Sequence, residues 1–141
     1  MSAQKVLLLG SGGREHAIAW KLSLSPKVQT IYVAPGNGGT ALEGSKIINV
    51  DLPINNFPAV SAWCHQQHIS LIVVGPEAPL ADGITDFLQR QQLLCFGPCK
   101  AAAKIEWDKC FGKQLMQKCC VPTAIWESFT EPQPAINYIA R

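Results

Sequence analysis

A short apolar run leads into a glycine-rich turn in the segment Lys5-Val6-Leu7-Leu8-Leu9-Gly10-Ser11-Gly12-Gly13-Arg14-Glu15-His16. Residues compatible with a helix follow from 14 to about 24, with apolar side chains at helical spacing. Glycines let the backbone approach a ligand closely, and free N–H groups at the start of a helix attract anions. The segment predicts a strand, a glycine turn and a helix, with a candidate anion site at the turn.

The same glycine pattern also suits a tight turn that binds nothing. Arg14 and His16 favour an anion, because they add hydrogen-bond donors beside the glycines. A dinucleotide site would need a third glycine where Glu15 stands, and an acidic residue at the end of the second strand. That strand ends in Val33-Ala34-Pro35. A nicotinamide-dependent oxidoreductase domain is therefore the weaker alternative, and the P-loop pattern of nucleotide-binding proteins does not occur.

Apolar runs alternate with helix-compatible segments as far as residue 98. We expect further strands at 30–33, 47–50, 71–74 and 93–96, and helices at 56–68 and 83–91. The run at 71–74 is continuously apolar, as is typical of a parallel strand that is covered on both faces. This alternation predicts an α/β fold, with a doubly wound, Rossmann-like parallel sheet of about five strands.

The pattern changes after residue 98. Residues 99–117 read as one or two helices, 123–126 as a short strand and 132–141 as another helix, without a completed sheet to pack against. We expect a substrate-binding domain at 1–98, followed at 99–141 by linker helices and the incomplete start of a further domain.

Two later loops should meet the first turn, because a doubly wound sheet binds ligands outside the carboxyl ends of its strands. The loop 34–40 contains Gly36 and Asn37 and is too rich in glycine to be helical. The loop 75–80 begins Gly75-Pro76-Glu77, and its prolines should stiffen it. The Glu77 carboxylate suits sugar hydroxyls or an amine, although a solvent-exposed loop acid or a charge at a helix start would also explain it.

Composition excludes several other classes of protein. The net charge of +2 comes from dispersed residues, which argues against nucleic-acid binding. The first apolar run is too short for a signal peptide or a membrane span, so we expect a cytoplasmic protein. The six cysteines should be free thiols, and no spacing of Cys and His predicts a metal site. We expect the remaining polar and aromatic candidates to be surface, capping or packing residues: His65, His68, Asp82, Asp86, Trp20 and Trp63.

Taken together, the three loops resemble those of the phosphoribosylamine-glycine ligase family. The resemblance rests on residues 10–16, on Ala34-Pro35-Gly36-Asn37, on residues 74–80 with Gly83, Ile84 and Asp86, and on Cys95-Phe96-Gly97-Pro98. It implies the amino-terminal part of an ATP-dependent ligase that joins 5-phosphoribosylamine to glycine in purine biosynthesis, using ATP and Mg2+. It also implies that the cleft binds the phosphoribosyl end of the substrate, through the set Gly10, Ser11, Gly12, Gly13, Arg14, Glu15, His16, Gly36, Asn37, Gly75, Pro76 and Glu77.

Within that set, the phosphate is expected at the turn from Ser11 to Arg14, with Asn37 and Glu77 facing the ribose and the amine. Residues 103–113 resemble the helix that enters the ATP-grasp domain of the family, and Lys109 aligns there with a lysine near the nucleotide phosphates. The alternative for Lys109 is a solvated lysine on a helix. Trp107, Asp108 and Cys120 depart from the family pattern.

The family's ATP lid and magnesium-binding carboxylates are expected beyond residue 141, so we expect no catalytic residue and no complete ATP site in these 141 residues. The chain should then be a fragment, a truncated product or one part of a longer polypeptide, such as the multifunctional protein of animals. A non-catalytic product that acts through protein contacts, for instance with a full-length ligase, is a further alternative.

Overall fold

The computed structural model describes residues 4–140. Its strands are β1 (Gln4–Gly10), β2 (Val28–Pro35), β3 (Ile47–Asn49), β4 (Leu71–Val74) and β5 (Cys95–Phe96). Its helices are α1 (Gly13–Ser23), α2 (Gly38–Leu42), α3 (Phe57–Gln67), α4 (Glu77–Asp82), α5 (Ile84–Arg90), α6 (Lys100–Trp107), α7 (Lys109–Lys118) and α8 (Pro132–Ile139). The chain divides into two compact units, one that runs to Ala103 and one that starts at Lys104.

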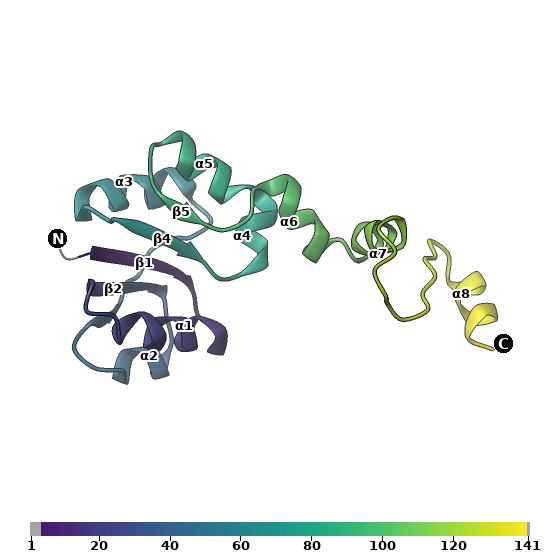
Figure 1. The fold of residues 1–141 in the computed structure, drawn as a ribbon, viewed down its shortest axis with the longest axis horizontal. Helices are drawn as coiled ribbons and strands as arrows, with labels where there is room; N and C mark the ends of the chain where they lie inside the picture. Colours follow the sequence, from purple (N-terminus) through teal and green to yellow (C-terminus); the bar gives the residue numbers. More distant parts are fainter. Residues whose placement is uncertain (1–3, 141) are drawn as a thin grey trace. The chain divides into compact units, whose positions relative to one another are not determined.

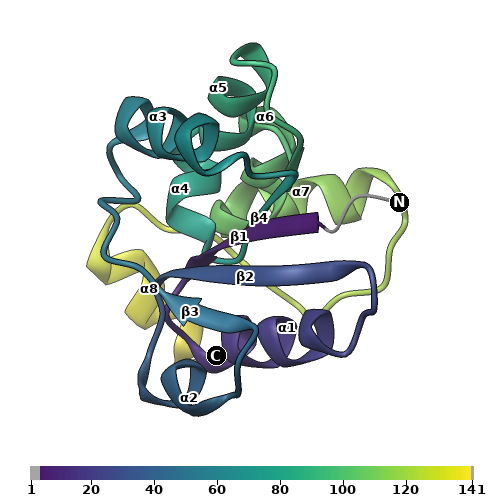
Figure 2. The same ribbon diagram turned by 90° about the vertical axis from the view of Figure 1, so that its left-hand side faces the viewer.

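The five strands form one parallel sheet in the order β3-β2-β1-β4-β5, of which Figure 1 labels β2, β1, β4 and β5. The chain starts in the central strand, winds outward to β3, and then crosses back to β4 and β5. Figure 2 shows α1 and α2 on one face of the sheet and α3, α4 and α5 on the other. The structure thus confirms the predicted α/β fold with a doubly wound parallel sheet of five strands.

Alternating residues of β1 supply the core on both faces of the sheet. Leu7 and Leu9 pack in the cluster that contains residues of α3, α4 and α5, whereas Val6 and Leu8 pack in the cluster that contains Ala19 of α1. The three leucines of β1 have no exposed surface. Burying each of them stabilises the fold by about 1.5–3 kcal/mol, so β1 is a rigid support for the turn that follows it.

Two short helices occupy loops that we expected to be irregular. In the loop 34–40, the Asn37 side chain accepts a hydrogen bond from Thr40 N at 3.0 Å and starts α2. This cap satisfies an N–H group at the helix start, and it offsets the poor helix propensity of Gly38 and Gly39. In the loop 75–80, Pro79 lies in the first turn of α4, where a residue without an N–H group is tolerated. The expectation that residues 34–40 are not helical was therefore wrong in part, whereas α4 places Glu77 at a helix start, an alternative that had been left open for it.

The second unit contains α7, α8 and an extended connection. The strand predicted at 123–126 is absent from this part of the described chain, where residues 121–129 have no regular structure. A strand needs a neighbouring strand to pair its N–H and C=O groups, and the described residues of this unit offer none. The predicted division into 1–98 and 99–141 stays a prediction, since the compact units meet inside α6.

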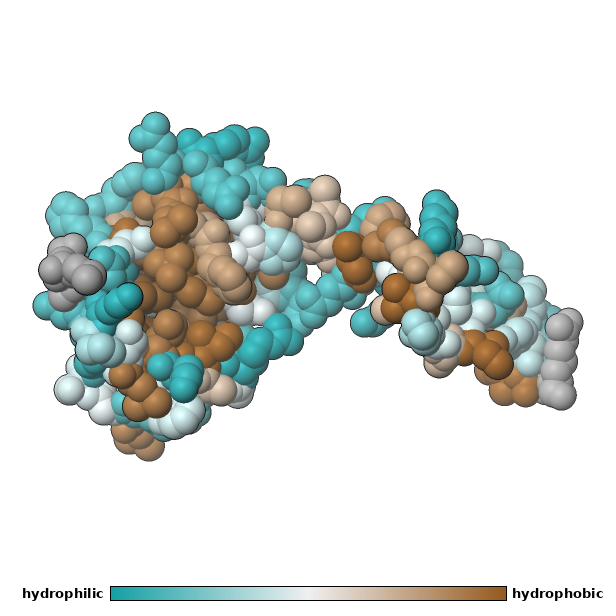
Figure 3. Space-filling view, in the orientation of Figure 1, coloured by the Kyte–Doolittle hydropathy of each residue, from teal (hydrophilic) through white to brown (hydrophobic). Residues whose placement is uncertain are grey.

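Large apolar side chains are exposed in the second unit, and Figure 3 shows hydrophobic residues at the surface of both units. In the second unit they are Ile105, Trp107, Met116, Val121, Ile125, Phe129, Ile136, Tyr138 and Ile139. No residue of α8 is buried. None of the helices in residues 4–140 is both long enough and apolar enough to cross a membrane.

Candidate functional site

The three predicted loops meet at one edge of the sheet. They follow β1, β2 and β4, which are adjacent parallel strands, so their carboxyl ends point the same way. Backbone hydrogen bonds join them directly: Gly36 N donates to Gly10 O at 3.1 Å, and Gly75 N donates to Leu9 O at 3.2 Å. The sequence prediction that these loops surround one site is consistent with this geometry.

The first turn is built around the side chain of Glu15, which is only 5% exposed. Its Oε2 atom accepts a hydrogen bond from Gly12 N at 2.7 Å. A Cβ atom on Gly10 would lie 2.5 Å from Glu15 Cγ, and a Cβ atom on Gly75 would overlap the same carboxylate. A side chain at either glycine would therefore displace Glu15, which lies between the ends of β1 and β4.

Arg14 joins the first loop to the third. Its Nη1 donates to Gly75 O, and its Nη2 donates to Glu77 Oε1, both at 2.7 Å. The Arg14 and Glu77 side chains are 56% and 43% exposed. Such an exposed ion pair adds little to stability, but it places a guanidinium and a carboxylate side by side at the solvent edge of the site.

Asn37 joins the second loop to the first. Its Nδ2 donates to Ser11 O at 2.9 Å and to Gly12 O at 3.3 Å, while its Oδ1 caps α2. Both ends of this amide are thus engaged by the protein. The side chain fixes the distance between the two loops, a role that was not apparent from the sequence.

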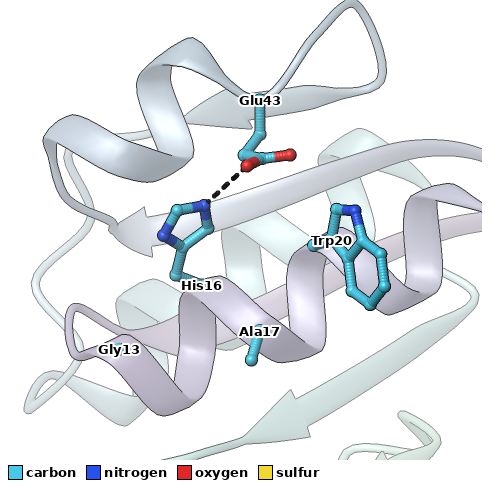
Figure 4. Close-up of a pocket in the computed structure, with 5 residues that line it drawn as sticks. All are labelled: Gly13, His16, Ala17, Trp20 and Glu43. Atoms are coloured by element: carbon cyan, nitrogen blue, oxygen red, sulfur yellow. Dashed lines mark hydrogen bonds and ion pairs between the residues drawn. The ribbon is translucent and has the colours of Figure 1, made fainter.

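His16 joins α1 to the end of α2. Figure 4 shows its ring pointing toward Glu43, with 3.0 Å between Nε2 and Oε1. Gly39 is packed so closely against the His16 ring that a Cβ atom there would lie 2.5 Å from it. Gly13, His16, Ala17, Trp20 and Glu43 line a shallow hollow beside the turn. Trp20 is 47% exposed there, so the expectation that it is a packing residue was wrong in part.

Sequence reasoning missed three residues that support the site. Thr40 is fully buried, and its hydroxyl donates to Asn49 Oδ1 at 2.7 Å. Asn49 Nδ2 in turn donates to Asn37 O at 2.9 Å. The third residue is Glu43. The position of Asn49 at the carboxyl end of β3 was an available signal, because that is the edge at which polar residues gather in such sheets.

The remaining predicted residues lie outside this cluster or at its border. Pro76 precedes α4 as its N-cap residue. His65 and His68 are exposed. Asp86 lies in the first turn of α5, as predicted, and its carboxylate accepts a hydrogen bond from Lys100 N at 2.7 Å. Lys109 is exposed at the start of α7 in the second unit.

Two of the six cysteines are buried, namely Cys64 and Cys95, and none of the six forms a disulfide. Burial raises the pKa of the Cys64 thiol to about 12 and also raises that of Cys95. Both groups therefore remain protonated at neutral pH, and thiolate chemistry at these two positions is disfavoured.

Within residues 4–140, no group of three or more His, Cys, Asp or Glu side chains could hold a metal ion. Mg2+ is usually bound through carboxylates together with substrate phosphates. The described residues thus do not fit a dedicated magnesium site, and no chemical step that uses ATP or Mg2+ follows from them.

Comparisons with known proteins identify relatives of the chain. The chain is 50% identical to the trifunctional purine biosynthetic protein adenosine-3 of Gallus gallus over 97% of its own length, which is 14% of that relative. It is 48% identical to the phosphoribosylamine--glycine ligase of Vibrio cholerae over 96% of its length and 31% of that relative. The chain therefore spans about a third or less of the length of these relatives.

A solved structure shares the fold. The biotin carboxylase subunit of pyruvate carboxylase aligns with 90% of this chain and 30% of its own, with a TM-score of 0.60 and 16% identity. That identity is too low to carry more than the fold. A family model described as "Phosphoribosylglycinamide synthetase, N domain" matches residues 4–106, which include all three loops. The chain belongs to this family of phosphoribosylglycinamide synthetase amino-terminal domains.

Proposed function

We propose that the three-loop edge of the sheet binds the phosphoribosyl end of 5-phosphoribosylamine. In this proposal the chain is the substrate-binding part of an ATP-dependent ligase that joins this amine to glycine in purine biosynthesis. The observation that carries the proposal is the convergence of the loops after β1, β2 and β4, with Arg14 and Glu77 side by side at the edge. The names of the relatives support the choice of substrates.

The phosphate is proposed to bind at the turn from Ser11 to Arg14. Ser11, Gly12 and Gly13 are exposed, and α1 starts at Gly13 with its N–H groups directed at the turn. The Arg14 guanidinium donates to Gly75 O and to Glu77 at the exposed edge of the same turn. This positive charge beside the turn supports an anion at that place.

Glu77 is proposed to face the ribose and the amine. Its side chain is 43% exposed and pairs with Arg14, the last residue of the proposed phosphate turn. We expected Asn37 beside it, but the Asn37 amide is engaged with Ser11, Gly12 and Thr40. We therefore assign Asn37 the role of holding the first and second loops at a fixed spacing, whereas Glu77 contacts the substrate.

The contribution of this domain to catalysis would be positioning. Holding the amine in place beside an activated glycine carboxyl group can lower the barrier by about 7–11 kcal/mol. In the whole ligase, ATP and Mg2+ would supply the activation of that carboxyl group. Lys109 remains a candidate contact for the ATP phosphates, and a cytoplasmic location remains part of the same proposal.

A calorimetric titration with ribose 5-phosphate tests the proposal on the 141-residue chain. We expect binding in the millimolar range or tighter, and much weaker binding of ribose, which lacks the phosphate. Arg14→Ala should weaken the binding by about 1–3 kcal/mol through the loss of charge-assisted hydrogen bonds.

Arg90→Ala is the matched control, because Arg90 is an exposed arginine in the last turn of α5 and its removal changes the net charge equally. It should leave the affinity unchanged. A folded chain that shows no heat of binding at millimolar ribose 5-phosphate would contradict the proposal, as would equal losses in the two arginine variants.

A further inference from the structure

Glu15 occupies a position that glycine holds in dinucleotide-binding turns. In those turns the second glycine lets the backbone approach a pyrophosphate, and the third lets the helix pack closely on the strand. In this chain Gly10 and Gly12 correspond to the first two positions, and Glu15 stands at the third. The fold and strand order are nevertheless those of the dinucleotide-binding sheet.

The Glu15 side chain folds back into the turn rather than out to solvent. Its Oε2 atom takes the hydrogen bond of Gly12 N, at 2.7 Å. Its carboxylate also fills the space beside Gly10 and Gly75, at the crevice between β1 and β4. A buried acidic side chain is uncommon, and this one is 5% exposed.

These contacts have two consequences for a phosphate-containing ligand. First, the N–H group that would meet a pyrophosphate at the second glycine is already engaged. Second, a pyrophosphate that crossed this crevice would face a carboxylate, and juxtaposing like charges opposes binding. A single terminal phosphate can avoid both, since it can remain at the exposed start of α1 beside Arg14.

We propose that Glu15 is a specificity-determining residue, which restricts the turn to ligands with one terminal phosphate and excludes those with a pyrophosphate bridge. This inference rests on the proposed phosphosugar site. It adds that the selectivity comes from a buried acid inside the turn, not from a residue that contacts the sugar.

The test compares two probes, ribose 5-phosphate and ADP-ribose, which carries a pyrophosphate between two riboses. Their dissociation constants are measured for the 141-residue chain and for Glu15→Ala and Glu15→Gln. The alanine variant vacates the crevice and releases Gly12 N, whereas glutamine fills the same space without the charge. Asp82→Asn, which removes an exposed carboxylate at the end of α4 that has no role in the proposed site, is the control. Circular dichroism and thermal unfolding establish that each variant is folded.

We expect the parent chain to prefer ribose 5-phosphate strongly. Glu15→Ala should reduce that preference at least about tenfold. Glu15→Gln should reduce it at least about threefold, because glutamine removes the repulsion between like charges but still fills the space. The control should keep the parent ratio. A folded Glu15→Ala with an unchanged ratio overturns the proposal; if that variant does not fold, an unchanged ratio in Glu15→Gln overturns it.

The outcome is separable from that of the proposed function. If ribose 5-phosphate does not bind to the parent, the phosphosugar site is contradicted, and ADP-ribose alone then tests Glu15. In that case, binding of ADP-ribose to Glu15→Ala but not to the parent would support the exclusion of pyrophosphates by Glu15. Binding of ADP-ribose to neither protein would overturn it.

Discussion

Replacing Asn37 with alanine should separate the first two loops of the site. The change removes the cap of α2, which costs about 0.5–2 kcal/mol. It also removes the bonds from Nδ2 to Ser11 O and Gly12 O. Since both lie near solvent, their loss should cost about 0.5–1.5 kcal/mol. We expect the free energy of unfolding to fall by about 2 kcal/mol in urea titrations, at an unchanged slope.

Asn56→Ala is the matched control for this experiment. Asn56 is also an N-cap asparagine, whose Oδ1 accepts from Ala59 N at 3.1 Å at the start of α3. Within residues 4–140 its side chain makes no hydrogen bond to another loop. The control should lose the capping contribution only, and it should bind ribose 5-phosphate like the parent. Asn37→Ala should bind at least about fivefold more weakly, for the loss of about 1 kcal/mol of loop organisation.

Equal losses of stability together with equal affinities in the two alanine variants would contradict a role of Asn37 in joining the loops. Asn37→Asp refines the comparison, because aspartate keeps the acceptor for Thr40 N and loses the donor toward Ser11 and Gly12. It should therefore retain the cap and lose the link between the loops. An Asn37→Asp variant that binds ribose 5-phosphate as tightly as the parent would show that the link has no role in binding.

Four further predictions concern packing, the thiols and the second unit. Gly75→Ala should destabilise the chain by about 1–3 kcal/mol in urea titrations, because the added Cβ atom would overlap Glu15. Gly13→Ala is the control, since a Cβ atom added there would meet nothing within 4 Å, and equal losses of stability in the two variants would contradict the packing. Native alkylation with iodoacetamide should modify Cys99, Cys110, Cys119 and Cys120 and spare Cys64 and Cys95, and labelling of all six would contradict the burial. Because burial raises the pKa of folded Cys64, its contribution to the free energy of unfolding should be present below pH 9.0 and lost as the pH rises toward 12. A stability difference between the parent and Cys64→Ala that stays constant over this range would contradict this. Limited proteolysis should cut residues 119–131 before any site in β1–β5, and initial cleavage within the sheet would contradict that order.

The sheet could be predicted from the sequence because its signals are local. Each strand of the first unit is an apolar run, and parallel strands covered on both faces need no finer pattern. The glycine loops then had to fall at the strand ends, so their convergence followed from the topology. The strand predicted at 123–126 failed for the opposite reason. Its apolar residues carry a strand signal, but a strand also needs a neighbour that local sequence cannot supply.

The two short helices and the link through Asn37 could not be predicted in the same way. A glycine-rich segment is a poor helix by propensity, and α2 exists because Asn37 caps it and because Thr40 is buried against Asn49. The cap is local, but the contact of Thr40 with Asn49 joins α2 to β3, and the contacts of Asn37 with Ser11 and Gly12 join two loops. The order of residues along the chain does not reveal contacts of this kind. An asparagine at position 37 was compatible with both a ligand contact and a helix cap.

The segment Arg14-Glu15-His16 explains why the loops are informative as a set. Successive residues of a helix point about 100° apart. Arg14 reaches the third loop at Gly75 and Glu77, Glu15 turns inward beneath Gly12, and His16 reaches Glu43 after α2. One turn of α1 therefore contacts all three walls of the site. A glycine turn alone would leave the other loops unconstrained. In this turn Glu15 packs against Gly75 and His16 packs against Gly39, where an added Cβ atom would force these side chains to shift. The residues of the three loops are thus constrained together, by contacts with a single helical turn.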